Sequence, residues 1–206
     1  MKKLFLIAGI ALMSLTANAQ DGLKGTWWVG GQLAFGSNDN NVTKTTSNTI
    51  LPVAGYFIAP TTTVGLGIGV INGKTETTAL GVTTTSSESS TFVVQPLVRK
   101  YWSVGGKFFF FGQASLPIML GNNKISDAKT TTISADLAPG FDFLVNKWMT
   151  VETSFSLVNI ASSTEKPATG DSTSSFSFDA NPFDLNKAAG DARSIGGLRV
   201  GVKFLF

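Results

Sequence analysis

Residues 63–71 read Thr-Val-Gly-Leu-Gly-Ile-Gly-Val-Ile, an unbroken alternation of apolar residues with glycine. Val64, Leu66, Ile68 and Val70 occupy every second position. A period of two is that of a β-strand, in which successive side chains point to opposite faces. This stretch therefore predicts a strand with one apolar face and one face that is almost bare.

The same alternation ends the chain. In a water-soluble sandwich the apolar face would look inward, whereas in a membrane barrel it would look out to lipid and the polar face would line the interior. Periodicity alone does not separate these two folds. One face carries Leu198, Val200, Val202, Phe204 and Phe206, and the other carries Gly197, Arg199, Gly201 and Lys203.

Strand length favours the membrane fold. Most of the strand-like segments reach the roughly 9 to 11 residues of a tilted membrane strand, more than the roughly 5 to 6 of soluble sheets. Eight such segments can be marked, at residues 25–36, 49–58, 62–72, 91–102, 107–121, 131–145, 148–161 and 194–206.

The connections between these segments alternate strictly between short and long. Short turns are expected at residues 59–61, 103–106 and 146–147, and long polar loops at 37–47, 73–90, 122–130 and 162–193. Short turns on one rim and long loops on the other are typical of outer-membrane barrels. We predict an all-β fold, an eight-stranded antiparallel up-and-down transmembrane β-barrel with both termini in the periplasm. A soluble lipocalin-like barrel with a ligand cup is the alternative.

Residues 1–19 resemble a cleavable signal peptide. Lys2 and Lys3 precede an apolar run at residues 4–15, and Ala-Asn-Ala follows at 17–19. The run is shorter than the roughly 20 residues of a membrane helix, so we expect the barrel domain to comprise residues 20–206. Removing both lysines lowers the formal net charge from +3 to +1, which gives no electrostatic case for a nucleic-acid partner.

The chain contains no cysteine and no histidine. Disulfides, the commonest zinc ligands and the usual general base are therefore missing. We expect no catalytic residues, no metal site and no cofactor, and hence a protein that is not an enzyme.

Several aromatic residues fall near the strand ends on the short-turn side. An aromatic girdle of a membrane barrel lies at that level, where the lipid headgroups meet water. Because aromatic residues also favour strands in general, the clustering at one rim is the informative part. The predicted girdle contains Trp27, Phe57, Trp102 and Trp148, with Phe108 close by.

With these features the chain resembles the small outer-membrane β-barrel family, the OmpA/OmpX-like porin-family proteins of Gram-negative bacteria. The resemblance rests on Ala-Asn-Ala-Gln at residues 17–20, Gly-Tyr-Phe at 55–57 and the final strand at 201–206. It implies an integral protein of the bacterial outer membrane in contact with outer-membrane lipid. It also implies that Phe206, Phe204 and Val202 form the signal read by the barrel-assembly machinery.

Strand alternation turns most of the strand-borne charge toward the interior. We predict a lumen charge network of Arg99, Asp142, Glu152, Arg199 and Lys203. An eight-stranded barrel is only wide enough for side chains to fill, and buried charges need partners there. A carboxylate pair for acid–base chemistry is the weaker interpretation, because no nucleophile or metal set accompanies it.

The glycines at residues 65, 67 and 69 leave space on the interior face. That space is either a small cavity or is filled by Tyr56 and Tyr101 from neighbouring strands, and small barrels commonly alternate large and small interior residues. We therefore expect a structural or surface-interaction protein, monomeric or weakly associating. A narrow conduit for ions or small solutes is the alternative, and a lipid-modifying enzyme the least favoured function.

The longest connection, residues 162–193, differs from the other polar loops. It contains Phe176, Phe178 and Phe183. Exposed aromatic residues mark recognition sites, so this loop is a candidate contact surface for an extracellular partner. A lid packed over the barrel mouth is the alternative.

Overall fold

The computed structural model describes residues 23–40, 42–79, 81–180 and 199–206, so the expected signal peptide at 1–19 lies outside the described residues. All regular elements of these residues are β-strands in antiparallel pairs. They contain no helix that could cross a membrane. The strands are β1 (Trp27–Asp39), β2 (Thr43–Ala59), β3 (Thr62–Ala79), β4 (Val82–Gly105), β5 (Phe108–Ser115), β6 (Ile118–Asn123), β7 (Lys129–Asn146), β8 (Met149–Ser154), β9 (Val158–Lys166), β10 (Thr173–Asp179) and β11 (Arg199–Leu205).

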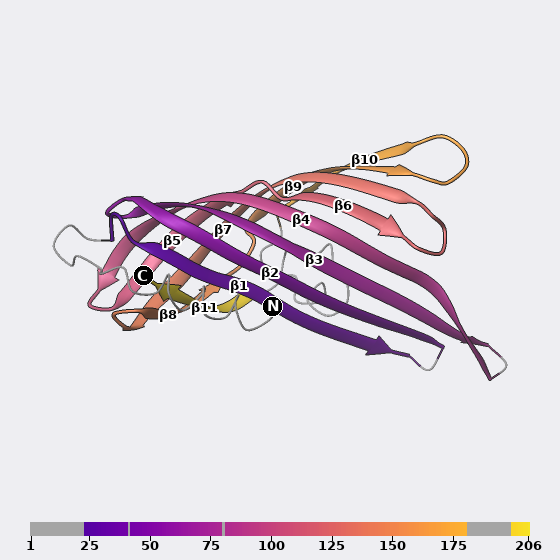
Figure 1. Ribbon diagram of the computed structural model, residues 1–206, viewed down its shortest axis with the longest axis horizontal. Helices are drawn as coiled ribbons and strands as arrows, with labels where there is room; N and C mark the ends of the chain where they lie inside the picture. The colour runs from indigo at the N-terminus through magenta and orange to yellow at the C-terminus, as the bar shows by residue number, and fades with distance from the viewer. Residues whose placement is uncertain (1–22, 41, 80, 181–198) are drawn as a thin grey trace, which may run out of the picture.

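The strand pairings return to their starting point (Figure 1). β1 pairs with β2, and the path runs through β3, β4, β5, β7 and β8 to β11, which pairs with β1 again. β6 continues the position of β5 between β4 and β7. The interruption falls at Leu116 and Pro117, where proline has no N–H to donate to the sheet. The expected segment at 107–121 is therefore two strands in one position of the ring.

At one end of the ring the strands are joined by short turns close to the ring itself. Only two residues separate β2 from β3, β4 from β5, and β7 from β8. The end of the chain lies at the same rim, since Trp27 N donates to Phe206 O at 3.0 Å and Phe206 N donates to Trp27 O at 2.8 Å. We call this the turn end, and the opposite end the hairpin end.

The long polar connections are shorter than expected, because the strands continue through them. β1 and β2 stay paired as far as Asp39 and Lys44, and β3 and β4 as far as Ala79 and Val82. Figure 1 shows these hairpins extending well beyond the ring. Threonine is a good strand former, and an antiparallel ladder needs no apolar face to continue. The expected loops at 37–47 and 73–90 are therefore mostly strand, the loop at 122–130 shrinks to residues 124–128, and β10 lies within the expected loop at 162–193.

The interior at the turn end contains a closely packed apolar cluster. Trp28, Phe57, Leu97 and Phe111 belong to one buried cluster there. A Cβ placed on Gly65 would lie 3.2 Å from Leu97 Cδ1. The bare face of β3 is therefore filled by side chains from neighbouring strands.

The residues that fill this face differ in part from the two tyrosines expected from the sequence. Tyr56 lies on the outer face, where its ring centroid is 4.9 Å from that of Trp27. Trp28 occupies the space expected for Tyr56, since its indole ring lies 3.3 Å from a Cβ placed on Gly65. Tyr101 is buried inside, as expected. The inner space beside the glycines of β3 is thus filled mainly by Trp28, Leu51, Val53 and Leu97.

Candidate functional site

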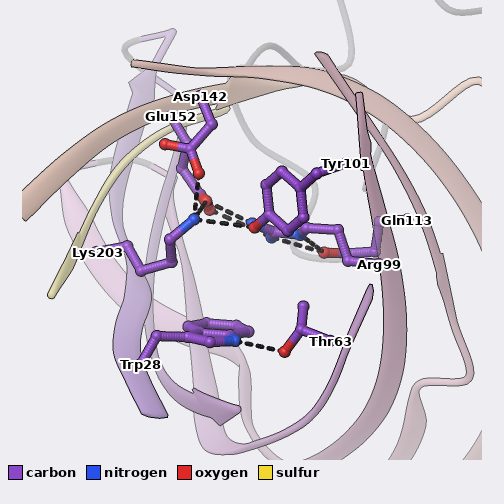
Figure 2. Close-up of polar contacts among 8 residues, drawn as sticks. All are labelled: Trp28, Thr63, Arg99, Tyr101, Gln113, Asp142, Glu152 and Lys203. Atoms are coloured by element: carbon purple, nitrogen blue, oxygen red, sulfur yellow. Dashed lines mark hydrogen bonds and ion pairs between the residues drawn. The ribbon is translucent and has the colours of Figure 1, made fainter. Parts of the chain in front are cut away.

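A network of charged side chains lies inside the ring near the turn end (Figure 2). Arg99 on β4 donates from Nη1 to Glu152 Oε2 on β8 at 2.5 Å, and from Nη2 to Glu152 Oε1 at 3.3 Å. The guanidinium also donates to Gln113 Oε1 from Nε at 3.1 Å and from Nη2 at 2.7 Å. Two-point contact of this kind fixes the orientation of a guanidinium as well as its position.

Lys203 on β11 is the second cation of the network, and only 1% of its surface is exposed. Its Nζ donates to Asp142 Oδ2, to Tyr101 Oη at 2.9 Å and to Glu152 Oε2 at 3.4 Å. Glu152 is thus shared between Arg99 and Lys203. The four side chains carry two positive and two negative formal charges, so the cluster balances itself.

Aromatic rings enclose the two cations. Arg99 Cζ lies 4.2 Å from the centroid of Phe111 and 5.4 Å from that of Trp28, and Lys203 Nζ lies 5.0 Å from that of Tyr101. A cation over an aromatic face is attracted by the ring electrons. Trp28 is fixed in turn by its own hydrogen bond, from Nε1 to Thr63 Oγ1 at 2.7 Å.

Strand register explains why these residues meet. Asp142 and Glu152 are directly paired across β7 and β8, and Glu152 is paired with Gly201 on β11. A Cβ on Gly201 would lie 3.4 Å from Glu152 Cγ, so the glycine leaves room for the glutamate side chain. Lys203 lies two residues beyond Gly201 on β11, and its side chain reaches both acids.

The structure brings together four of the five residues expected in the network: Arg99, Asp142, Glu152 and Lys203. The backbone of Arg199 pairs with Ser154, but its side chain lies outside the described part of the chain. Sequence reasoning did not include Gln113 in the network, although it lies directly opposite Arg99 across β4 and β5. It missed the hydrogen bonds of Tyr101 and Trp28, because the alternation of a strand gives the face of an aromatic residue and not its polar partner.

Three of the four expected girdle residues are exposed near the turn end. Trp27, Trp102 and Trp148 face outward with about half of their surface exposed, at 54%, 48% and 54%. Phe57 is fully buried, so its assignment to the girdle is wrong. It packs inside against Tyr101, with ring centroids 5.6 Å apart.

The expected assembly residues lie on the final strand. Val202 and Phe204 face outward, while Lys203 and Leu205 between and after them face inward. Phe206 is half-buried and its backbone pairs with Trp27. Phe204 stacks on Trp148, with ring centroids 5.9 Å apart.

The network is suited to holding charges and not to moving them. Each carboxylate has a cationic partner, which is the arrangement that makes buried ions such as Asp142 tolerable. Among the described residues, no group of three or more potential metal ligands was found.

A scan against protein-family models and a search of curated protein sequences each found no match. The solved structures to which the chain is similar include two outer membrane proteins. One is the outer membrane protein OprG from Pseudomonas aeruginosa, with 13% identity over 92% of this chain and 99% of that chain and a TM-score of 0.48. The other is a major outer membrane protein from Thermus thermophilus, with 13% identity over 88% and 98% of the two chains and a TM-score of 0.35.

Proposed function

We propose that this protein is an integral, non-enzymatic β-barrel of a bacterial outer membrane, with its outer face in lipid and its hairpins presented outside the cell. One observation carries the proposal. Lys203 is buried, whereas its neighbours Val202 and Phe204 are exposed. The ion is inside and the apolar residues outside, the reverse of a water-soluble protein.

The same inversion recurs on β7. Asp142 is buried, while Phe141 and Phe143 on either side of it are 39% and 46% exposed. On β3, Val64, Leu66, Ile68 and Val70 are all exposed in one row. A continuous apolar surface of this kind is rare on soluble monomers and is what a lipid-facing barrel presents.

Flotation with lipid vesicles tests this function. The chain from Gln20 is refolded into phospholipid vesicles and centrifuged in a density gradient, and its gel mobility is compared with and without boiling. A membrane barrel floats with the vesicles and changes mobility on boiling. A chain that folds in buffer without vesicles and stays at the bottom of the gradient contradicts the proposal.

The turn end is proposed to face the periplasm. Both ends of the described chain lie there: the start of β1 pairs with Phe206, and Gly25 N donates to Phe57 O at 2.9 Å. The exposed tryptophans at that rim suit the headgroup level. In this orientation Val202, Phe204 and Phe206 remain the proposed signal for the barrel-assembly machinery.

The interior supports a structural or surface-interaction role. The charge network and the aromatic cluster of Trp28, Phe57 and Phe111 fill the ring at the turn end.

The alternative is a narrow conduit, which a cavity of about 540 Å³ at the hairpin end favours. Planar-bilayer conductance separates the two: the filled barrel is silent, and a conduit shows steady channels that change when Arg99 is replaced by Ala.

The hairpin of β9 and β10 is the candidate surface for an outside partner. Phe176 and Phe178 are 73% and 63% exposed. They alternate along β10 with Ser175 and Ser177, which line the cavity, so the phenylalanines point away from it. This favours an outward contact surface over a lid. Phe183 lies outside the described residues.

A further inference from the structure

The hairpin end of the molecule encloses a cavity of about 540 Å³. Residues from β2, β3, β4, β6, β7, β9 and β10 line it, so it continues the interior of the ring beyond the charge network. Its volume is within the roughly 300–1,000 Å³ of small-molecule sites. Several lining residues on β10, Thr173, Ser175 and Ser177, are also exposed, so solvent and solutes reach it.

The lining is dominated by neutral hydrogen-bonding groups. Of the 24 described lining residues, 13 are Ser or Thr and three are Asn. A hydroxyl group can both donate and accept a hydrogen bond, and so can the side-chain amide of Asn. Pairs of these groups already lie within reach of each other across strands, such as Thr132 Oγ1 and Ser163 Oγ at 2.9 Å.

The lining is poor in charge and in rings. Its charged residues are Lys74 and Glu165, both exposed, and none of the described lining residues is aromatic. Lys74 is engaged by Glu76, with Nζ 2.6 Å from Oε1. An anion would therefore find no free cation among the described lining residues, and a cation would find a single exposed carboxylate, Glu165. An apolar ligand would leave many hydroxyls without water or a partner, which is costly.

The deeper part of the wall offers one buried donor. Asn159 Nδ2 is shielded from solvent and has no hydrogen-bond partner among the described groups. Ser134 lines the same part of the wall from the neighbouring strand β7, where it pairs with Ala161. A buried amide nitrogen of this kind costs free energy until an acceptor reaches it.

We propose that this cavity binds a neutral, hydroxyl-rich solute of the size of a small sugar. Such a ligand supplies donors and acceptors in about equal number, as the wall does, and brings no charge that the wall would have to balance. The site does not require the membrane placement proposed above, although its opening to the cell exterior rests on it.

Single cysteines report on occupancy, because the chain has no cysteine of its own. Thr132 faces the cavity, and its neighbour Thr131 faces outward, so Thr132→Cys and Thr131→Cys are a matched pair on β7. The refolded chain in detergent micelles reacts with a charged methanethiosulfonate reagent, with and without glucose. Glucosamine and glucuronate, the positively and negatively charged relatives of glucose, are compared at the same concentrations.

Glucose is expected to slow modification of Thr132→Cys at least about threefold, in a saturable way, and to leave Thr131→Cys unchanged. The charged sugars protect less. Adding Thr130→Val, which keeps the shape of a second lining residue but removes its hydroxyl, raises the half-protecting glucose concentration about two- to tenfold, the usual effect of one lost hydrogen bond. This shift in the half-protecting concentration distinguishes specific binding of glucose through hydrogen bonds from nonspecific filling of the cavity.

Two results overturn the proposal. One is an unchanged rate at Thr132→Cys with glucose up to about 100 mM, well above a millimolar Kd. The other is equal protection by all three sugars, which indicates a water-filled vestibule without selectivity. The change of gel mobility on boiling is recorded for each variant, so that loss of the barrel is distinguished from loss of binding.

Discussion

Asp142 and Glu152 are paired directly across β7 and β8, two carboxylates side by side on the inner face of the ring. Like charges in this position repel each other. Lys203 Nζ donates to both, and Arg99 donates to both oxygens of Glu152. The two strands are therefore joined at this level by a residue of a third strand, β11, which also closes the ring with β1.

Replacing Lys203 with Met should be severely destabilising. The change removes the group between the two carboxylates and leaves Asp142 buried without its cation. Breaking a buried pair from one side costs about 3–5 kcal/mol. Urea unfolding of the refolded protein in micelles measures the free energy of unfolding.

Lys100→Met is the matched control for this substitution. Lys100 is exposed near the turn end, where its Nζ donates to Thr61 Oγ1 at 2.6 Å. An exposed contact of this kind contributes little, within about 0.5 kcal/mol. A loss for Lys203→Met no larger than that for Lys100→Met would show that the network does not stabilise the ring.

Thr63→Val should destabilise the protein by about 1–3 kcal/mol, because the buried Trp28 Nε1 loses its acceptor. Thr63→Ser keeps the hydroxyl and should retain most of the stability. Tryptophan fluorescence during urea unfolding follows both variants. A larger loss for Ser than for Val would mean that methyl packing, and not the hydrogen bond, matters at this position.

Gly55→Ala should also be destabilising, by about 1–3 kcal/mol, the typical cost of overpacking a full interior. A Cβ on Gly55 would overlap the indole ring of Trp28. Gly112→Ala is the control, since its Cβ would make an ordinary 3.5 Å contact with Trp102. Thermal unfolding of the two variants should differ clearly, and matching midpoints would contradict the packing described here.

The hairpin end predicts a pH effect. Lys124 Nζ lies 2.5 Å from Glu88 Oε1, and this hydrogen bond lowers the pKa of the Glu88 carboxyl below its ordinary value of 4.5. The stabilisation from the pair is fully present above the unfolded pKa and is lost as pH falls through the lower, folded pKa. Lys124→Met should therefore raise the pKa of Glu88, as measured by carboxyl NMR titration. An unchanged pKa would show that the pair does not form in solution.

Much of the charge network can be predicted from the sequence, because its charged residues lie between apolar neighbours. Asp142 lies between Phe141 and Phe143, and Lys203 between Val202 and Phe204. With apolar residues on one face, alternation alone places the charges on the other. Neighbouring strands then bring charges at similar heights together.

Where the two faces of a strand have the same polarity, alternation no longer shows which face points inward. The prediction from the sequence fails at these positions. Around Phe57 the inner face carries Val53 and Leu51, and the outer face also carries apolar residues such as Ile58. An aromatic residue suits either side, so its direction depends on the register. In the Ser- and Thr-rich hairpins both faces are polar, and alternation cannot show that the strands continue or that they enclose a cavity.

Spin labels on two adjacent residues of β4 show whether the apolar face of the ring lies in lipid or in water. Val98 is 43% exposed and Leu97 only 7%. Nitroxides are attached to Val98→Cys and Leu97→Cys, the protein is refolded into lipid vesicles, and collision rates with oxygen and with a water-soluble nickel complex are measured. With the apolar face in lipid, collisions at position 98 are frequent with oxygen and rare with nickel, and the label at position 97 is immobile. Frequent nickel collisions at position 98 would place that face in water and contradict the proposed membrane barrel.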